Sequence, residues 1–167
     1  MSAAQLVAGC PLFHEIYDNE VEEIIADCMV ASYQPGDFII NQGDTNTDIC
    51  VLLQGHAKVT ISKDGKDQDV AKLNKGDLFG ELVLINETKR TASIVAVDQC
   101  DILVMTYENF FSYFQKKPKV FALMVLNVTR LITKRLKNST ETIQKLNKDL
   151  YELSLRLQTP EENKKTA

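Results

Sequence analysis

The sequence predicts a mainly β protein, an antiparallel β-roll (a double-stranded β-helix, or jelly roll) with flanking helices. Between residues 29 and 106, short apolar runs alternate with turn-forming segments such as Pro35-Gly36-Asp37, Asp64-Gly65 and Lys75-Gly76-Asp77. Many short strands separated by such turns are typical of an antiparallel sandwich or barrel. After Pro118, neither glycine nor proline occurs until Pro160. This second feature is typical of one long helix.

The expected strands are short and lie on the apolar runs. The runs are Phe38–Ile40, Ile49–Leu53, Val59–Ile61, Val70–Leu73, Ala92–Val97 and Ile102–Met105. In the turns between them, glycine supplies a positive-φ corner and aspartate bonds the neighbouring backbone. We expect the strands to form two sheets that enclose one core.

Two helices are expected at the borders of the roll. Before it, apolar residues recur at helical spacing from Leu12 to Cys28, with acids on the other face, and Pro11 occupies a position where a helix can begin. After it, Tyr107–Gln115 predicts a short aromatic helix that ends at Lys117-Pro118. Its three phenylalanines are expected to cap the open end of the roll.

The long C-terminal helix carries a coiled-coil seam. Leu136, Ile143, Leu150 and Leu157 fall at heptad position a, and Ile132, Ser139, Leu146 and Leu153 at position d. A domain of this size cannot cover the whole stripe, so beyond about Ser139 we expect a second copy of the chain to cover it. Each buried leucine contributes about 1.5–3 kcal/mol, so the apolar seam positions of two chains together can hold a homodimer. Docking onto a partner's helix is the alternative, and the few charges beside the seam leave parallel and antiparallel pairing open.

We therefore divide the chain into three parts: the roll with its flanking helices (1–118), the dimerising helix (119–158) and a disordered tail (159–167). The chain has 167 residues, of which 44% are hydrophobic, and a net charge of −4. No apolar run approaches the ~20 residues of a membrane span, and no secretion signal is visible. The four cysteines never occur in C-x-x-C spacing, which indicates reduced thiols in a cytoplasmic protein.

The segment Gly76–Arg90, GDLFGELVLINETKR, carries the chemistry. Gly80 lacks a side chain, so a ligand can approach the backbone there. Glu81 is placed to accept hydrogen bonds from hydroxyl groups, and a helical turn after it would offer N–H groups to an anion. Arg90, nine residues after Glu81, is suited to clamp a phosphate or carboxylate. A small molecule with sugar hydroxyls and one phosphate matches this set.

Phe79-Gly80-Glu81-Leu82, with Arg90-Thr91-Ala92 following, resembles the phosphate-binding cassette of cyclic nucleotide-binding domains. The resemblance extends over nearly the whole chain: the N-terminal helix, the turns of the roll, the aromatic helix and the long helix follow the family's order. It implies a sensor that binds cyclic AMP or cyclic GMP and needs no cofactor, no metal and no catalytic residue. Members with threonine at position 91 include cyclic GMP binders among eukaryotes and cyclic AMP binders among bacteria, and we favour cyclic AMP.

Carried over residue by residue, the resemblance implies that Glu81 bonds the ribose 2′-hydroxyl and Arg90 pairs with the cyclic phosphate. The backbone of Gly80 and Leu82 would line the ribose. Thr91 and Ala92 would contact the phosphate through N–H or hydroxyl groups.

The family's base contact lies on the long helix. Counting from Pro118 indicates Arg135, whereas motif likeness at Asn127-Val128-Thr129 indicates Thr129, and we rank Arg135 first.

Three features depart from the family's pattern. Lys89 stands where a proline is usual, and Val83 stands where a small residue is usual. No helix-turn-helix domain follows the long helix in this sequence, so we expect a sensor and dimerisation unit.

Other readings remain. The cassette could have lost its ligand, leaving a dimerisation adapter, and Glu81 and Arg90 could form a salt bridge that staples a loop. A metal-dependent enzyme on a similar roll would need clustered histidines, and the chain has only His14 and His56, far apart. Seven basic residues and no acid occur between Lys116 and Lys137, but the net charge and the lack of a reading motif argue against DNA binding.

Overall fold

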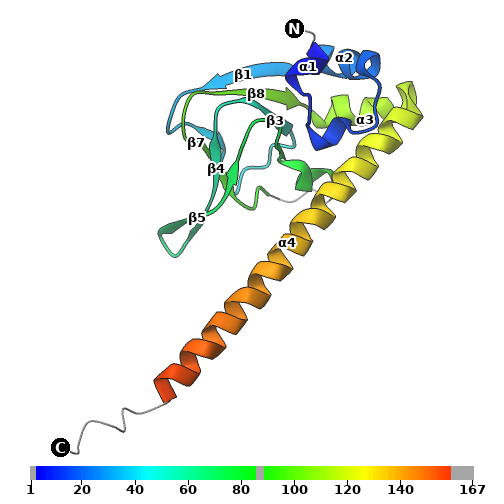
Figure 1. The fold of residues 1–167 in the computed structure, drawn as a ribbon. Helices are drawn as coiled ribbons and strands as arrows, with labels where there is room; N and C mark the ends of the chain where they lie inside the picture. Colours follow the sequence, from blue (N-terminus) through cyan, green and yellow to red (C-terminus); the bar gives the residue numbers. More distant parts are fainter. Residues whose placement is uncertain (1–2, 86–88, 159–167) are drawn as a thin grey trace, which may run out of the picture. The chain divides into compact units, whose positions relative to one another are not determined.

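The structure, a computed structural model, describes residues 3–85 and 89–158. The expected disordered tail, 159–167, lies outside the described residues. Within them the chain forms an antiparallel β-roll with flanking helices, as the sequence predicts (Figure 1).

Two four-stranded antiparallel sheets make up the described part of the roll. One sheet has the order β1-β8-β3-β6 and the other the order β2-β7-β4-β5. The strands are β1 (Met29–Tyr33), β2 (Phe38–Ile40), β3 (Ile49–Gln54), β4 (Ala57–Lys63), β5 (Lys66–Leu73), β6 (Leu78–Phe79), β7 (Ser93–Ala96) and β8 (Cys100–Met105). All six predicted apolar runs contain strand residues.

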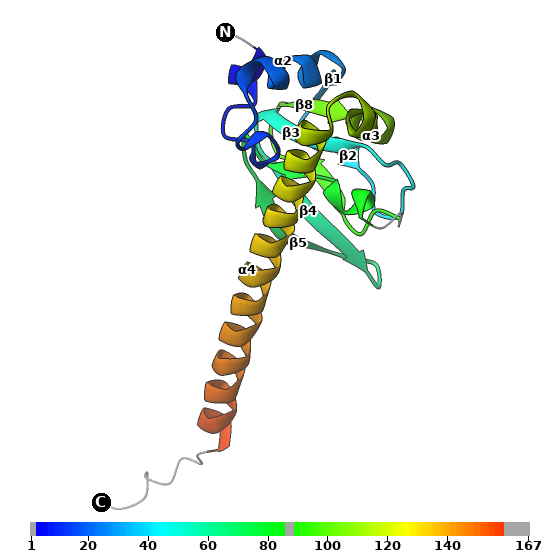
Figure 2. The same cartoon turned by 90° about the vertical axis from the view of Figure 1, so that its right-hand side faces the viewer.

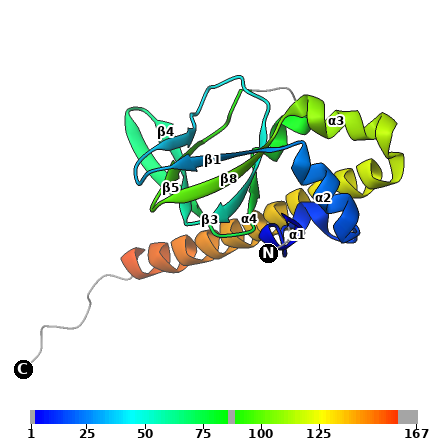
Figure 3. The same ribbon diagram turned by 90° about the horizontal axis from the view of Figure 1, so that it is seen from above.

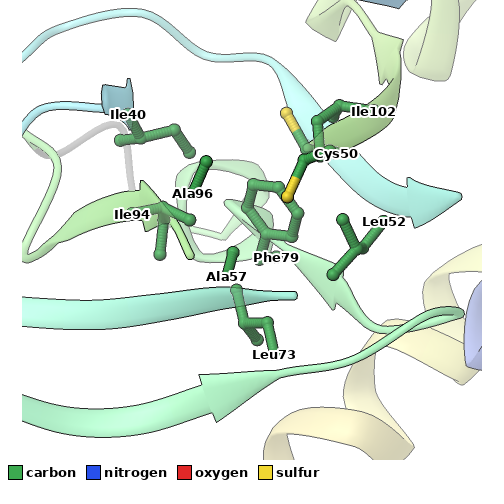
Figure 4. Close-up of a cluster of buried hydrophobic side chains, with 10 residues drawn as sticks. Ile40, Cys50, Leu52, Ala57, Leu73, Phe79, Ile94, Ala96 and Ile102 are labelled. Atoms are coloured by element: carbon green, nitrogen blue, oxygen red, sulfur yellow. The ribbon is translucent and has the colours of Figure 1, made fainter. Parts of the chain in front are cut away.

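The core lies between the two sheets (Figure 4). Side chains at alternate positions of a strand face the same side, so Leu52 follows Cys50 into the core and Ala96 follows Ile94. The buried cluster consists of Ile40, Cys50, Leu52, Ala57, Leu73, Phe79, Ile94, Ala96, Cys100 and Ile102. Both sheets therefore contribute to one hydrophobic interior.

Strands β1 and β6 were not among the predicted strands. β1 is the last strand of its sheet, is paired with β8 on one side, and leaves Met29 and Val30 largely exposed. β6 has only two residues, both paired with β3. Two residues are too few to predict β6, and the apolar residues at the start of β1 directly follow those assigned to the N-terminal helix.

The single helix predicted from Pro11 to Cys28 is wrong. The structure has α1 (Ala3–Leu6), a 3-10 turn η1 (Pro11–Phe13) and α2 (Asp18–Ala26). The backbone at Glu15 has φ 64°, in the left-handed region, and this breaks the helix between η1 and α2. The apolar periodicity persists because both pieces bury one face, including Leu12 in η1 and Ile24 in α2.

The aromatic helix is confirmed as α3 (Tyr107–Lys116). The hydroxyl oxygen of Thr106 caps it by accepting a hydrogen bond from the N–H of Asn109 at 3.1 Å. Its three phenylalanines gather on Phe121 in the next helix, with ring centroids 5.5 to 5.7 Å from that ring. These contacts join α3 to the start of α4.

Helices α2 and α3 lie side by side (Figures 2 and 3). Asp27, the residue directly after α2, links them. Its main-chain oxygen accepts a hydrogen bond from Asn109, and its carboxylate is reached by Tyr113 Oη at 3.3 Å and by Lys116 Nζ at 3.4 Å.

The long helix is α4 (Pro118–Gln158). The chain divides into two compact units, residues 1–128 and 129–167, so the first turns of α4 belong to the first unit. There Val120, Met124, Asn127 and Val128 are buried. Asn127 donates two hydrogen bonds from Nδ2, to the main-chain oxygens of Leu12 at 3.0 Å and His14 at 2.7 Å.

Candidate functional site

Gly80 connects β6 to a 3-10 turn, η2 (Glu81–Leu84). Its φ of 78° and ψ of 5° are left-handed, a conformation that glycine adopts without steric cost. A Cβ at this position would lie 2.8 Å from Nη1 of Arg90 and 2.9 Å from the main-chain oxygen of Asp48. We expected the missing side chain to admit a ligand, and in the structure it admits the guanidinium of Arg90.

Arg90 is buried, with 6% of its surface exposed. Each nitrogen of its guanidinium donates a hydrogen bond: Nε to Asn46 Oδ1 at 2.7 Å, Nη1 to the carbonyl of Gly80 at 2.9 Å, and Nη2 to the carbonyl of Asp48 at 2.5 Å. Its main chain is tied to the same loop, because Arg90 N donates to Asp44 O and Gly43 N donates to Arg90 O, both at 2.8 Å. The β2–β3 loop therefore positions both the backbone and the side chain of Arg90.

Burial lowers the pKa of Arg90, and the nearby groups of Cys50, Asp48 and Glu81 act in the opposite direction. An arginine stays protonated near neutral pH even so. Burial also raises the pKa of the Cys50 thiol to about 12, so this neighbour is neutral. The site thus holds a permanent positive charge in a poorly solvated place.

Glu81 begins η2 and is also buried, with 4% of its surface exposed. Its charge raises the pKa of Arg90, which places the two groups in one electrostatic neighbourhood. The three hydrogen bonds of the guanidinium nevertheless go to oxygens of Asn46, Gly80 and Asp48. Among the described residues, these three contacts of the guanidinium hold the loop.

The remaining cassette residues lie close by in the chain but differ in exposure. Leu82 is 45% exposed on η2. Thr91 is exposed and Ala92 is half-buried, both just before β7. Of the two departures from the family's pattern, Val83 is buried in the protein and Lys89 is exposed.

The two predicted base contacts belong to the second compact unit. Thr129 is exposed on α4, and Arg135 lies further along the same helix. Their role as base contacts stays a prediction.

Asn46 and Asp48 were not among the predicted site residues. They lie in the loop between β2 and β3, more than 40 positions before Arg90. No sequence motif in that loop predicts a contact with an arginine. The Gly43-Asp44 pattern in this loop predicts a turn of the roll, but it does not predict which side chains the loop contacts.

A separate cavity of about 570 Å³ lies at the β4–β5 hairpin. Its lining residues are His56, Ala57, Lys58, Asp69, Val70, Ala71, Lys72, Leu73, Asn74 and Val97. Its lining includes neither Glu81 nor Arg90, so this cavity is distinct from the cassette.

In residues 3–85 and 89–158, no three His, Cys, Asp or Glu side chains group in a way that could hold a metal ion. No helix in the same ranges is both long and apolar enough to cross a membrane.

Comparison with known proteins agrees with the fold and the cassette. The sequence profile of the cyclic nucleotide-binding domain family matches residues 30–117. The chain is 29% identical over 132 residues to the cyclic AMP receptor protein of Thermus thermophilus, covering 78% of this chain and 59% of that protein. It is 33% identical over 147 residues to the human potassium/sodium hyperpolarization-activated cyclic nucleotide-gated channel 1, covering 87% of this chain and 16% of the channel.

Solved structures show the same likeness. The catabolite activator protein of Thermus thermophilus superposes with a TM-score of 0.72 at 28% identity, over 82% of this chain and 63% of that one. A cyclic nucleotide-binding domain from Methylobacillus flagellatus shares the fold with a TM-score of 0.77 at 21% identity, over 86% and 82%. This chain belongs to the cyclic nucleotide-binding domain family. It spans less than two thirds of the length of the two relatives compared by sequence.

Proposed function

We propose that this chain binds a cyclic mononucleotide, with Arg90 on the cyclic phosphate and Glu81 on the ribose 2′-hydroxyl. The observation that carries the proposal is the state of Arg90: a buried guanidinium whose hydrogen bonds to the described residues all go to uncharged oxygens. Its positive charge is held in place by these oxygens, none of which belongs to a carboxylate. An anion that enters the site meets a charge that water screens poorly.

The guanidinium also has the donors that a phosphate needs. It carries five N–H groups, and three are used by Asn46, Gly80 and Asp48. Nη1 and Nη2 each carry a second N–H, and we propose these as donors to the phosphate oxygens. Gly80, Leu82, Thr91 and Ala92 complete the proposed contacts to ribose and phosphate.

Cyclic AMP is our first choice of ligand and cyclic GMP the second. The match to a cyclic AMP receptor protein covers 78% of this chain. A cyclic GMP-dependent protein kinase of Homo sapiens is 33% identical over 147 residues, so the second nucleotide belongs in every test. Arg135, with Thr129 as the alternative, is the proposed base contact.

We further propose a homodimer through α4 that relays ligand binding to a downstream protein, in the cytoplasm and without catalysis. The support is the seam beyond Ser139, whose apolar residues have exposed side chains in the single chain. These residues are Ile143, Leu146, Leu150, Leu153 and Leu157. Covering them in a second copy removes apolar surface from water. A dimerisation adapter with a degenerate ligand site is the alternative function.

Calorimetric titration with cyclic AMP, cyclic GMP and 5′-AMP tests the binding proposal. We expect saturable heat with at least one cyclic nucleotide and much weaker binding of 5′-AMP, whose phosphate is not closed into a ring. No heat with either cyclic nucleotide up to millimolar concentration contradicts the proposal and favours the adapter.

A further inference from the structure

The guanidinium of Arg90 has three acceptors among the described residues, and one of them is a side chain. Gly80 and Asp48 accept through main-chain carbonyls, whereas Asn46 accepts through Oδ1, 2.7 Å from Nε. A single substitution can therefore change the acceptor at Asn46, whereas the two main-chain carbonyls remain whatever the side chain is. With one oxygen on each nitrogen, the plane of the guanidinium is fixed.

The uncharged state of this acceptor matters because Arg90 lies among acids. The charges of Asp44, Asp48 and Glu81 all act on its pKa. The hydrogen bonds of the guanidinium go to other oxygens than these carboxylates, and Asp48 contributes its carbonyl instead. A carboxylate on Nε would hold the side chain equally well but would cancel its charge at short range.

The loop around Asn46 is held independently of the amide. Gly43 and Asp44 bond the main chain of Arg90, and Asn41 Nδ2 donates to Asp44 Oδ2 at 3.3 Å. Asn46 itself is exposed. Replacing its side chain therefore removes one contact and leaves the ties of the loop in place.

We infer that Asn46 is a positioning residue that orients Arg90 for an anionic ligand, and that its being an amide leaves the positive charge available. The inference deepens the proposed function. The nucleotide titrations in its test rest on that function, and the NMR measurement does not. The amide acts through Arg90 and need not touch the ligand.

The test compares Asn46→Ala, Asn46→Asp and a charge control, Thr45→Asp. Thr45 is the exposed neighbour in the same loop, so its replacement adds the same charge without replacing the acceptor on Nε. In the ligand-free full chain, NMR measures exchange of the Arg90 Nε–H with water. Four arginines make this spectrum simple, and Arg90→Lys assigns the signal. Thermal unfolding and titration with cyclic AMP and cyclic GMP complete the set.

For Asn46→Ala we expect faster Nε–H exchange and about tenfold weaker nucleotide binding, the scale of one hydrogen bond to a charged group. For Asn46→Asp we expect a protected Nε–H and no loss of thermal stability, yet binding weakened by at least about tenfold. Thr45→Asp should weaken binding by no more than about threefold, as exposed charges do. A role in presenting the charge of Arg90 predicts this separation of stability from affinity, whereas a purely structural role predicts that the two fall together.

Asn46→Asp binding as tightly as the native chain overturns the charge argument. Equal losses for Asn46→Asp and Thr45→Asp show a general field effect and overturn it too. Unchanged exchange in Asn46→Ala removes the positioning role. If the native chain binds neither nucleotide, the proposed function fails, while the Nε–H measurement still decides whether Asn46 positions Arg90.

Discussion

The guanidinium of Arg90 lies so close to Gly80 that a side chain on the glycine would have no room. The carbonyl of Gly80 accepts from Nη1 of Arg90 at 2.9 Å, and a Cβ on Gly80 would lie 2.8 Å from the same nitrogen. The corner before Glu81 and the buried arginine ten residues later are thus one structural unit.

Gly80→Ala should therefore cost more than backbone strain alone. Gly65→Ala is the matched control, because Gly65 also has a positive φ, of 71°, but a Cβ there would meet no described atom within 4 Å. The control should lose about 1–2 kcal/mol of unfolding free energy from left-handed strain. Gly80→Ala should lose at least about 1 kcal/mol more, because Arg90 must move. Urea denaturation measures both, and equal losses would contradict the close fit.

Arg90→Ala should weaken cyclic nucleotide binding by about 2–3 kcal/mol, the scale of a charge-assisted hydrogen-bond pair. Arg90→Lys keeps the charge but loses the planar fork, so it should bind less tightly than the native chain. Lys89→Ala removes a neighbouring exposed charge and serves as the control. Calorimetric titration gives all three affinities, and an undiminished affinity in Arg90→Ala would show that the phosphate contact is misassigned.

Three thiols should make the fold sensitive to alkaline pH. Burial raises the pKa values of Cys10, Cys28 and Cys50 to about 12 from an ordinary value of 9.0. The folded state holds these protons more tightly than the unfolded state. Their stabilising contribution is therefore complete below pH 9 and is lost as the pH rises from 9 towards 12.

At pH 10 this loss is about 1.4 kcal/mol for each thiol. Cys28→Ala should reduce the fall in unfolding free energy between pH 8 and pH 10 by roughly that amount, measured by urea denaturation at each pH. Lysines and tyrosines titrate in both proteins, so the difference between them isolates the thiol. The same fall in both would contradict the raised pKa of Cys28.

The seam on α4 gives a prediction about assembly. Leu150→Lys places a charge at position a and should dissociate the proposed dimer, since a charge buried without a partner is costly. Lys148→Glu also changes a charge on this helix, but at position f, and should leave the dimer intact. Truncation after Lys137 removes most of the seam and should weaken association. Analytical ultracentrifugation distinguishes these outcomes, and a dimer that survives both Leu150→Lys and the truncation must use another surface.

The sequence alone determined the class of fold and indicated the two charged residues that we propose for the ligand site. Ile49–Leu53 was predictable as a strand because its five apolar residues must be removed from water, and all five are buried. The helix α4 was predictable because no residue from 119 to 158 breaks a helix. Glu81 and Arg90 were recognisable because their spacing is local. These features depend on residues that are close together in the sequence, so the sequence is sufficient to predict them.

Tertiary structure decided the rest. The break at Glu15 and the edge strand β1 depend on what the rest of the protein packs against them. The partners of Arg90 come from the β2–β3 loop and from Gly80, and two of the three acceptors are main-chain carbonyls, which every residue carries. Because residue identity does not reveal which carbonyl accepts a hydrogen bond, only the fold shows that uncharged oxygens hold this buried charge.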